Sequence, residues 1–354
     1  MIGIGRAYLL WQRSTMLEQQ LALANTFDGC ANSHALCRKI MDSPTCSERS
    51  RRTAIHAALT IITRDGPGHL TFDAIAREIG VSKDRLIHQF RTKENLLKAL
   101  LEHQTRYFES FSRDYLVAIG SAKPETTLLA QIATTRESMA QPHSIVFAIF
   151  AALVEDPELL STNREIDAKN VKRIEEEAAD PELAMLRWTA ARGLALMALF
   201  ELCPLSEKER ERLFDRLLDE HQWLSPSSTS KQRSVGSLEN LFRGNLAAIG
   251  SGRPETTLLT QIATVRESIA HPHPAAFAIF AALMDDPELP SINREINAKK
   301  LERMKEEAAA PELAVLRWAA AIGLALTTLF DLCPLSEKKR GRLFDRLLDE
   351  RQWQ

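Results

Sequence analysis

The chain lacks the features that mark several large classes of protein. It has 5 cysteines and 3 tyrosines in 354 residues, and its formal net charge is −2. No apolar run approaches the roughly 20 residues that cross a bilayer, and residues 1–10 lack the apolar stretch and cleavage site of a secretory signal. The cysteines are odd in number and show no CxxC spacing, which predicts reduced thiols rather than a disulfide framework. We therefore expect a cytoplasmic protein without a membrane segment.

Motifs of common enzymes are also lacking. We find no GxSxG, HExxH or P-loop motif, and no GxGxxG motif in a suitable context. The near-zero net charge does not by itself indicate a nucleic-acid partner, but residues 48–110 carry about three more basic than acidic residues, and residues 111–354 about six more acidic ones. We expect no catalytic residues, no metal and no cofactor.

The strongest feature of the sequence is an internal repeat. Residues 116–223 align without a gap to residues 246–353, with about 78 identities over roughly 108 positions. Each copy is rich in Glu and Ala, lacks β-branched runs and breaks at prolines, which predicts helices throughout. Helix N-termini are indicated by Asp-Pro-Glu starting at Asp156, Asp180 and Asp286, and by the capping box of Ser206 with Glu209. The second copy loses the cap at Ala310 and keeps half of the box at Ser336 with Lys339.

A series of shorter helix signals precedes the first copy. Apolar spacing predicts helices over 47–64, 72–79 and 83–90, and a long helix that begins at 93. N-cap residues precede the last three helices: Thr71, Ser82 and Thr92. Gly80 permits the left-handed turn between the second and third helices. Two short capped helices joined by a glycine turn are typical of a helix-turn-helix, whose second helix enters the major groove.

These residues resemble the DNA-binding signature of the tetracycline-repressor (TetR) family over about 55 residues. The matching features are Thr-x-x-x-Ile-Ala from Thr71, the Gly-Val-Ser turn from Gly80, a recognition helix that ends in Phe90, and Lys-Glu-x-Leu from Lys93. One departure is Ile87, which stands where many members have a tyrosine that contacts phosphate.

The repeated units are similar, more weakly, to the C-terminal effector domains of one branch of that family. The similarity rests on Gly-Leu-Ala-Leu at Gly193 and Gly323 and on Cys-Pro-Leu-Ser-Glu at Cys203 and Cys333. Arg192 and Ile322 depart from it, because an acidic residue usually precedes Gly-Leu.

The resemblance implies an all-α fold in which an N-terminal three-helix DNA-binding domain precedes two homologous helical effector and dimerisation domains. We expect five segments: a leader, a helix-turn-helix domain, a first effector domain, a linker and a second effector domain, over 1–46, 47–100, 101–224, 225–245 and 246–354. The leader is expected to be disordered or over-annotated, since Met16 and Met41 are both possible starts.

Eight residues are expected to contact DNA: Thr71, Ser82, Lys83, Arg85, His88, Gln89, Thr92 and Lys93. Arginine pairs with guanine and glutamine with adenine in the major groove, and residues at helix N-termini commonly bind phosphate. The competing interpretation is a solvated helix face with ordinary caps; for His88 it is a packed surface side chain.

Aromatic and methionine residues at helical spacing in the first copy are candidates for lining a ligand pocket, together with one arginine: Met139, Phe147, Phe150, Met185, Trp188, Arg192 and Met197. Core packing is the competing interpretation, and it is favoured by the spacing. Arg192 would bind an acidic effector, or would pair with Glu201 or another acid as part of the structure.

These observations predict a ligand-responsive repressor that binds double-stranded operator DNA and an unknown small-molecule effector. The alternatives are a helical interaction protein without specific operator binding, and an enzyme of unknown type. We favour a homodimer of chains through the last two helices of an effector domain. Pairing of the two near-identical copies within one chain is the other possibility.

Overall fold

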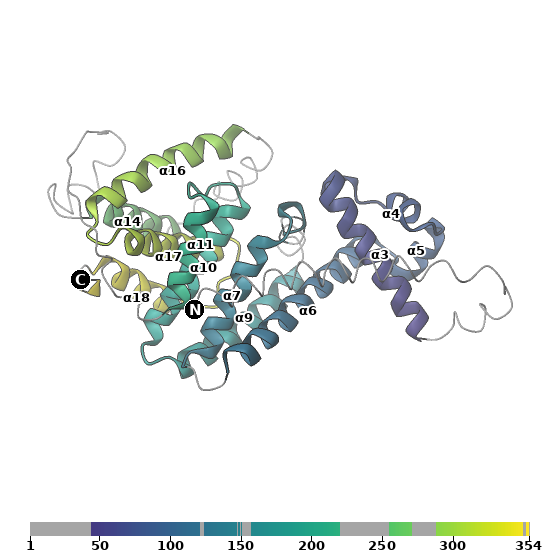
Figure 1. The fold of residues 1–354 in the computed structure, drawn as a ribbon, viewed down its shortest axis with the longest axis horizontal. Helices are drawn as coiled ribbons and strands as arrows, with labels where there is room; N and C mark the ends of the chain where they lie inside the picture. Colours follow the sequence, from purple (N-terminus) through teal and green to yellow (C-terminus); the bar gives the residue numbers. More distant parts are fainter. Residues whose placement is uncertain are drawn as a thin grey trace. The chain divides into compact units, whose positions relative to one another are not determined.

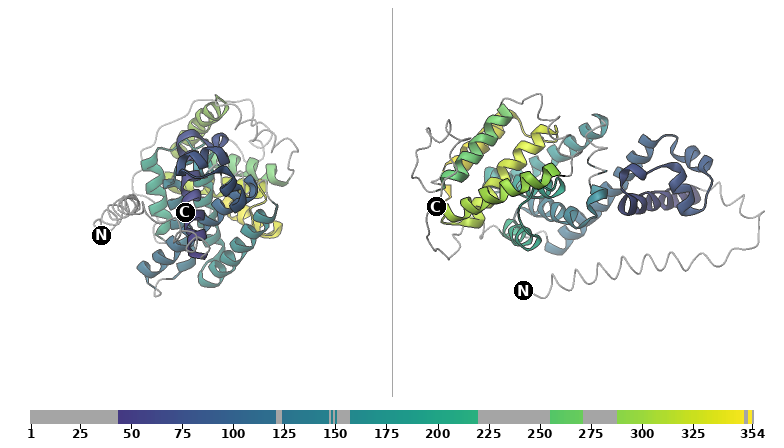
Figure 2. Two further views of the ribbon diagram at one scale, coloured as in Figure 1. Left: turned by 90° about the vertical axis from the view of Figure 1, so that its right-hand side faces the viewer. Right: turned by 90° about the horizontal axis from the view of Figure 1, so that it is seen from above.

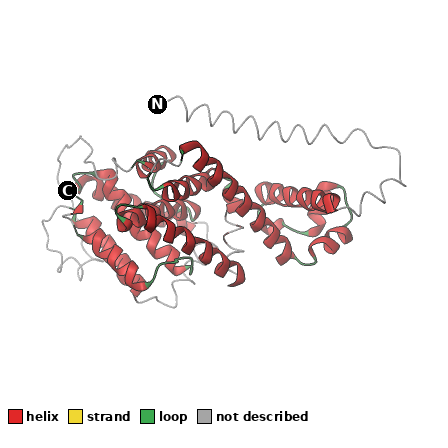
Figure 3. Cartoon of the chain, turned by 90° about the horizontal axis from the view of Figure 1, so that it is seen from below, coloured by secondary structure: helices red, strands yellow, loops and turns green. Residues whose placement is uncertain are grey.

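The computed structural model describes residues 44–120, 124–146, 148, 150, 157–219, 255–270, 288–349 and 352–353. These residues form helices and contain no strand (Figure 3), which confirms the predicted all-α class. Residues 1–43 of the expected leader and the whole expected linker lie outside the described residues. So do Phe147 and the expected caps Asp156 and Asp286. The chain divides into two units, 1–56 and 57–354, and each is described by itself.

In the first unit, the described residues belong to helix α3 (Pro44–Asp65), which begins three residues before the expected start and continues into the second unit. The second unit then has a 3-10 turn, η1 (Pro67–His69), and two short helices, α4 (Phe72–Ile79) and α5 (Lys83–Phe90). The bounds of α4 and α5 are those that the sequence predicts.

Helix α6 (Lys93–Ile119) follows and is 27 residues long. It runs without interruption through the boundary expected between residues 100 and 101. The helix that begins beside the helix-turn-helix therefore also packs against the first helix of the first copy, α7 (Thr126–Ala140).

The two copies of the repeat form equivalent sets of helices. After α7, the first copy has α9 (Pro157–Glu177), α10 (Pro181–Leu199) and α11 (Glu207–Leu218). The second has α14 (Thr256–Ala270), α16 (Glu288–Glu307), α17 (Pro311–Leu329) and α18 (Glu337–Leu348).

The caps that fall on described residues are as expected. Asp180 accepts a hydrogen bond from the backbone N–H of Leu183, Ala310 provides no side-chain cap, and Ser206 and Glu209 complete a capping box.

A buried arginine organises each copy. The Arg187 guanidinium is fully buried, and its Nη1 lies 2.5 Å from Oε2 of Glu125, while Nε and Nη2 donate to the carbonyl of Leu217. In the second copy, Arg317 Nη1 donates to Oε2 of Glu255 and Nη2 donates to the carbonyl of Leu347. These bonds join the residue before the first helix of a copy to the end of its last helix. Because a buried charge needs a partner, the pair is part of the core of each copy.

The two copies pack against each other through α10 and α17, which make the most extensive helix-to-helix contact among the described elements (Figure 1). One continuous cluster of buried apolar residues includes Trp188 and Leu194 from the first copy and Trp318 and Leu324 from the second. In Figure 2 the green and yellow helices of the second copy lie against the teal helices of the first. The copies therefore share one hydrophobic core.

The backbones of α10 and α17 meet at two equivalent glycines. A Cβ added to Gly193 would overlap the carbonyl oxygen of Ala319, and one added to Gly323 would overlap the carbonyl oxygen of Thr189. Each added atom would also lie 2.9 Å from the amide nitrogen of the other glycine. The distance between packed helices depends on the side chains at their contact, so only glycine permits this approach.

By length and composition, α17 is the one helix among the described residues that could cross a membrane. It has 19 residues with a mean hydropathy of 1.4, and 72% of the apolar stretch is buried. Glu312 and Arg317 interrupt the apolar run, which is why the sequence did not indicate a span. The contact with α10 accounts for its apolar composition, because this face is core.

The helices expected to form a dimer interface are the ones that pair, but their partner is the other copy in the same chain. In the described chain, α10 and α17 cover one another, and α18 contacts α10. The dimer of chains expected from the sequence would need a different surface, or an exchange of copies between chains.

Ion pairs border this contact. Arg346 in α18 pairs with Asp180. At the corresponding position of the first copy, Nη1 of Arg216 in α11 lies 3.2 Å from Oε2 of Glu312. Nζ of Lys305 in α16 lies 2.8 Å from Oε1 of Glu209 in α11. The hydrogen bond from Lys305, followed by the one from the backbone of Ser206, lowers the pKa of Glu209 to about 2.

We predict that Gly193→Ala and Gly323→Ala each lower the free energy of unfolding by about 1–3 kcal/mol, because the new methyl group forces the helices apart. Urea denaturation will measure this. Gly341→Ala in α18 is the matched control. A Cβ at Gly341 meets no atom within 4 Å. The free energy of unfolding should therefore rise by about 0.5–1 kcal/mol, as is usual when alanine replaces glycine inside a helix. Equal stability of G193A and G341A would contradict the close contact.

We also predict that the chain loses stability in acid partly through Glu209. The folded pKa of about 2 lies below the reference value of 4.5. The stability contributed by this carboxylate is therefore fully present above pH 4.5 and is lost as the pH falls toward 2. Between pH 5 and pH 3, the thermal midpoint of Glu209→Gln should fall less than that of the wild type. Glu211→Gln, an exposed change in the same helix, should follow the wild type.

Candidate nucleic-acid interface

Helices α4 and α5 form a helix-turn-helix whose turn is set by local hydrogen bonds. Gly80 has φ 66° and ψ 34°, the left-handed conformation expected of a glycine at this turn. The Thr71 hydroxyl accepts from the N–H of Ala74 at 3.1 Å, and the Ser82 hydroxyl accepts from the N–H of Arg85 at 3.4 Å. Leu86 and Phe90 bury one edge of α5. The predicted caps, turn and buried edge are confirmed.

The remaining side chains of α5 face outward. Arg85 and His88 are exposed and Gln89 is half-buried. Lys83, also exposed, has Nζ 2.7 Å from Oδ2 of Asp73 in α4. An exposed pair of this kind contributes little to stability, so phosphate can compete for the ammonium group. Arg85, His88 and Gln89 thus share the side of α5 away from the buried edge, whereas Lys83 lies at the start of the helix and pairs with an acid of α4.

The start of α6 extends this surface. Thr92 accepts from the N–H of Asn95 at 3.2 Å, and Thr92 and Lys93 are exposed. The chain reverses at Arg91, whose φ of 64° is unusual for a residue other than glycine. Hydrogen bonds from the backbone N–H of Glu94 and from Thr92 lower the pKa of Glu94. This helix N-terminus therefore stabilises a negative charge, which is the property that phosphate binding requires.

Ile87 is the large apolar residue on the outward surface of α5, with 38% of its surface exposed. It occupies the position where the family resemblance places a tyrosine in many members. An isoleucine cannot donate a hydrogen bond to phosphate, but an apolar group in the major groove can contact the methyl group of thymine.

The residues proposed to line a ligand pocket lie mainly in the core. Met185, Trp188 and Met197 are buried, and Met139 packs against the same cluster. The Phe150 ring makes edge-to-face contacts with Phe200 and with Phe330 from the second copy. Core packing, the competing interpretation, thus accounts for these five side chains. Of the candidates within the described part of the chain, Met185 also borders the cleft described below.

Arg192 has a structural partner. Its Nη1 lies 2.7 Å from Oδ2 of Asp167 in α9, and its guanidinium lies 4.5 Å from the ring centroid of Trp188. Asp167 is buried. The interpretation that Arg192 pairs with an acid of the protein agrees with this geometry, with Asp167 in place of the suggested Glu201. Asn297 and Ile322 stand at these positions in the second copy, so only the first copy has the pair.

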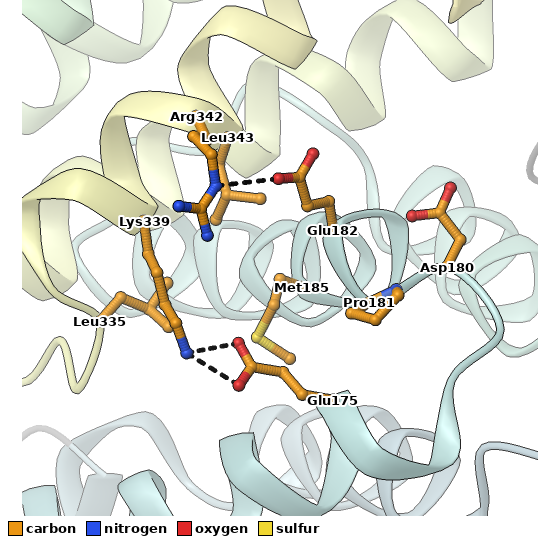
Figure 4. A pocket seen from close by; sticks show the side chains of 9 residues that line it. All are labelled: Glu175, Asp180, Pro181, Glu182, Met185, Leu335, Lys339, Arg342 and Leu343. Atoms are coloured by element: carbon orange, nitrogen blue, oxygen red, sulfur yellow. Dashed lines mark hydrogen bonds and ion pairs between the residues drawn. The ribbon is translucent and has the colours of Figure 1, made fainter.

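A cleft of 380 Å³ lies where the copies meet, and sequence reasoning missed it (Figure 4). Its apolar floor includes Met185 from the first copy and Leu343 from the second. At the rim, Lys339 Nζ lies 2.7 Å from Oε1 of Glu175, and Arg342 Nε lies 3.1 Å from Oε1 of Glu182. A charged ligand entering the cleft would compete with these pairs. No sequence signal shows such a cleft, because its walls come from helices about 160 residues apart.

Comparison with family models gives three matches. Residues 54–100 match the family described as bacterial regulatory proteins, tetR family. Residues 125–221 and again residues 256–350 match the tetracyclin repressor-like, C-terminal domain. Comparisons with curated proteins and with solved structures found no match. The matched segments cover more than half of the chain, and they confirm both the family resemblance and the duplication. The chain therefore belongs to the TetR family of DNA-binding transcriptional regulators, with its C-terminal domain present twice.

Proposed function

We propose that this protein is a ligand-responsive transcriptional repressor that acts in the cytoplasm and binds double-stranded operator DNA. The observation that carries the proposal is the outward surface of α5, where polar side chains stand opposite a buried Leu86 and Phe90 edge. Helix α5 enters the major groove while α4 braces it against the DNA backbone.

The candidate residues divide into two roles. Arg85 and Gln89 contact base edges, since their side chains form bidentate hydrogen bonds with guanine and adenine. The others contact phosphate and fix the register of the protein on the duplex: Thr71, Ser82, Lys83, His88, Thr92 and Lys93.

The described part of each chain supplies one helix-turn-helix, whereas specific recognition by this motif ordinarily uses two half-sites about one helical turn apart. We therefore propose that two chains bind one operator. Their effector copies remain paired within each chain, so contacts made on the DNA bring the two chains together.

An effector molecule would act by binding one arrangement of the helical domains more tightly than another. Helix α6 provides the connection, because it begins at the DNA-binding surface and packs against α7 of the first copy. The cleft at Met185 is the candidate binding site among the described residues, and its apolar floor suits a small organic molecule.

We predict distinct effects for base-contacting and phosphate-contacting side chains. Arg85→Ala and Gln89→Ala should each cost on the order of 1–3 kcal/mol of binding and relax the preference at one base position. Lys93→Ala should weaken binding to all sequences and reduce the slope of log K against log salt by about one. Fluorescence anisotropy with operator and scrambled duplexes will measure both effects.

Lys299→Ala is the control for that experiment, because Lys299 is exposed and pairs only locally, with Glu295 in α16. Light scattering of the complex gives its stoichiometry, and we expect two chains on each operator. Unchanged affinity in the triple variant R85A/Q89A/K93A would contradict the assignment and favour an interaction protein without operator specificity.

We predict repression in a reporter strain that carries the operator upstream of a fluorescent protein. The wild type should lower expression, and R85A/Q89A/K93A at the same protein level should not. Compounds that restore expression should also raise the thermal midpoint of the wild type. They should have a smaller effect on Arg342→Ala, which removes a cationic side chain from the rim of the cleft. Increased expression with the wild type would identify an activator instead.

A further inference from the structure

Three positions of the repeat carry opposite charges in the two copies, and at two of them the first copy has an acid and the second a lysine. At the third, Lys172 corresponds to Glu302, and Lys172 pairs with Glu176 in its own helix. At the other two, Glu175 in α9 corresponds to Lys305 in α16, and Glu209 in α11 corresponds to Lys339 in α18. The first copy thus has an acid at both positions and the second copy has a lysine at both. At both of these positions the charge changes from negative in the first copy to positive in the second, although 34 residues separate the positions within each copy.

The structure brings these four side chains together crosswise, between copies. Lys339 Nζ lies 2.7 Å from Oε1 of Glu175, and Lys305 Nζ lies 2.8 Å from Oε1 of Glu209. The four side chains are between 29% and 38% exposed. Screening by solvent is therefore weaker here than for fully exposed pairs.

The same geometry is unfavourable when two first copies, or two second copies, from different chains pair with each other. In a pair of first copies, Glu175 would face Glu209 twice, and in a pair of second copies Lys305 would face Lys339 twice. Like charges held in contact oppose association, and specific interfaces use this repulsion to reject competing partners.

Two other kinds of contact between the copies do not select in this way. The glycines at the α10–α17 crossing are identical, as are the arginines Arg216 and Arg346. Position 180 does differ, because Asp180 corresponds to Ala310. A pair of first copies would gain one Arg–Asp pair there, but it would replace two Lys–Glu pairs with two Glu–Glu contacts.

Lys339 stabilises the N-terminus of its own helix less than a glutamate would. In the first copy, Glu209 Oε2 accepts from the backbone N–H of Ser206 and completes the capping box, while Oε1 receives Lys305. Lys339 cannot accept a hydrogen bond from Ser336, so α18 keeps half of the box. Local helix stability alone would favour glutamate at position 339, and the ion pair with Glu175 provides the compensation.

We propose that Glu175 and Glu209 with Lys305 and Lys339 form a charge code that makes pairing of the effector copies heterotypic, so that each chain closes on itself and does not dimerise through this surface. The first copy therefore pairs with the second copy of its own chain. This inference does not depend on DNA binding, and it is tested without DNA.

The test uses the full-length double variant K305E/K339E, in which all four positions are acidic. Glutamate at position 339 completes the capping box and should stabilise α18. The two Lys–Glu pairs become Glu–Glu contacts, which should destabilise the pairing of the two copies. We expect the thermal midpoint to fall by roughly 3–8 °C and the deficit to shrink as salt is added. K208E/K338E makes the same net-charge change at exposed neighbouring positions and should stay within about 2 °C of the wild type.

The quadruple swap E175K/E209K/K305E/K339E restores opposite charges with the signs exchanged and moves the complete capping box from α11 to α18. Its thermal midpoint should return to within about 2 °C of the wild type. Light scattering at micromolar concentration should give the mass of one chain for both proteins. An unchanged midpoint in K305E/K339E, no recovery in the quadruple swap, or a wild-type mass of two chains would each overturn the proposal.

Discussion

The close contact of α10 with α17 at Gly193 and Gly323 is the constraint on which the rest of the effector region depends. Each glycine faces a backbone carbonyl of the other helix, so the two backbones approach without an intervening side chain. Trp188 and Trp318 are thereby enclosed in one core rather than two. An apolar helix such as α17 would otherwise expose a large surface to water.

This arrangement changes the relation between effector domains and DNA-binding domains. Within the described residues, a single chain contains a pair of effector domains and one helix-turn-helix, which α6 connects to the first copy. The two copies need not remain equivalent, because in this structure each pairs with the other and not with its own kind. The Asp167–Arg192 pair occurs in the first copy alone, and the Glu–Lys differences follow the same freedom to diverge.

Much of the candidate DNA surface was predictable because its signals are local. Thr71, Gly80 and Ser82 act on residues within one turn of themselves, so caps and turn follow from the order of residues along the chain. The candidate ligand residues were not predictable in the same way. Met197 and Trp188 at helical spacing are compatible with a core or with a cavity, and packing of the whole domain decides between them.

By itself, the sequence determined the all-α class, the duplication, the bounds of α4 and α5 and the helices available for pairing. Tertiary structure alone decided that these helices pair within one chain, that Arg187 and Arg317 are buried against Glu125 and Glu255, and that a cleft forms at Met185. Periodicity and capping report interactions over three or four residues. The contacts that join the two copies link positions about 95 to 170 residues apart, and at that separation only the packed fold specifies which side chains meet.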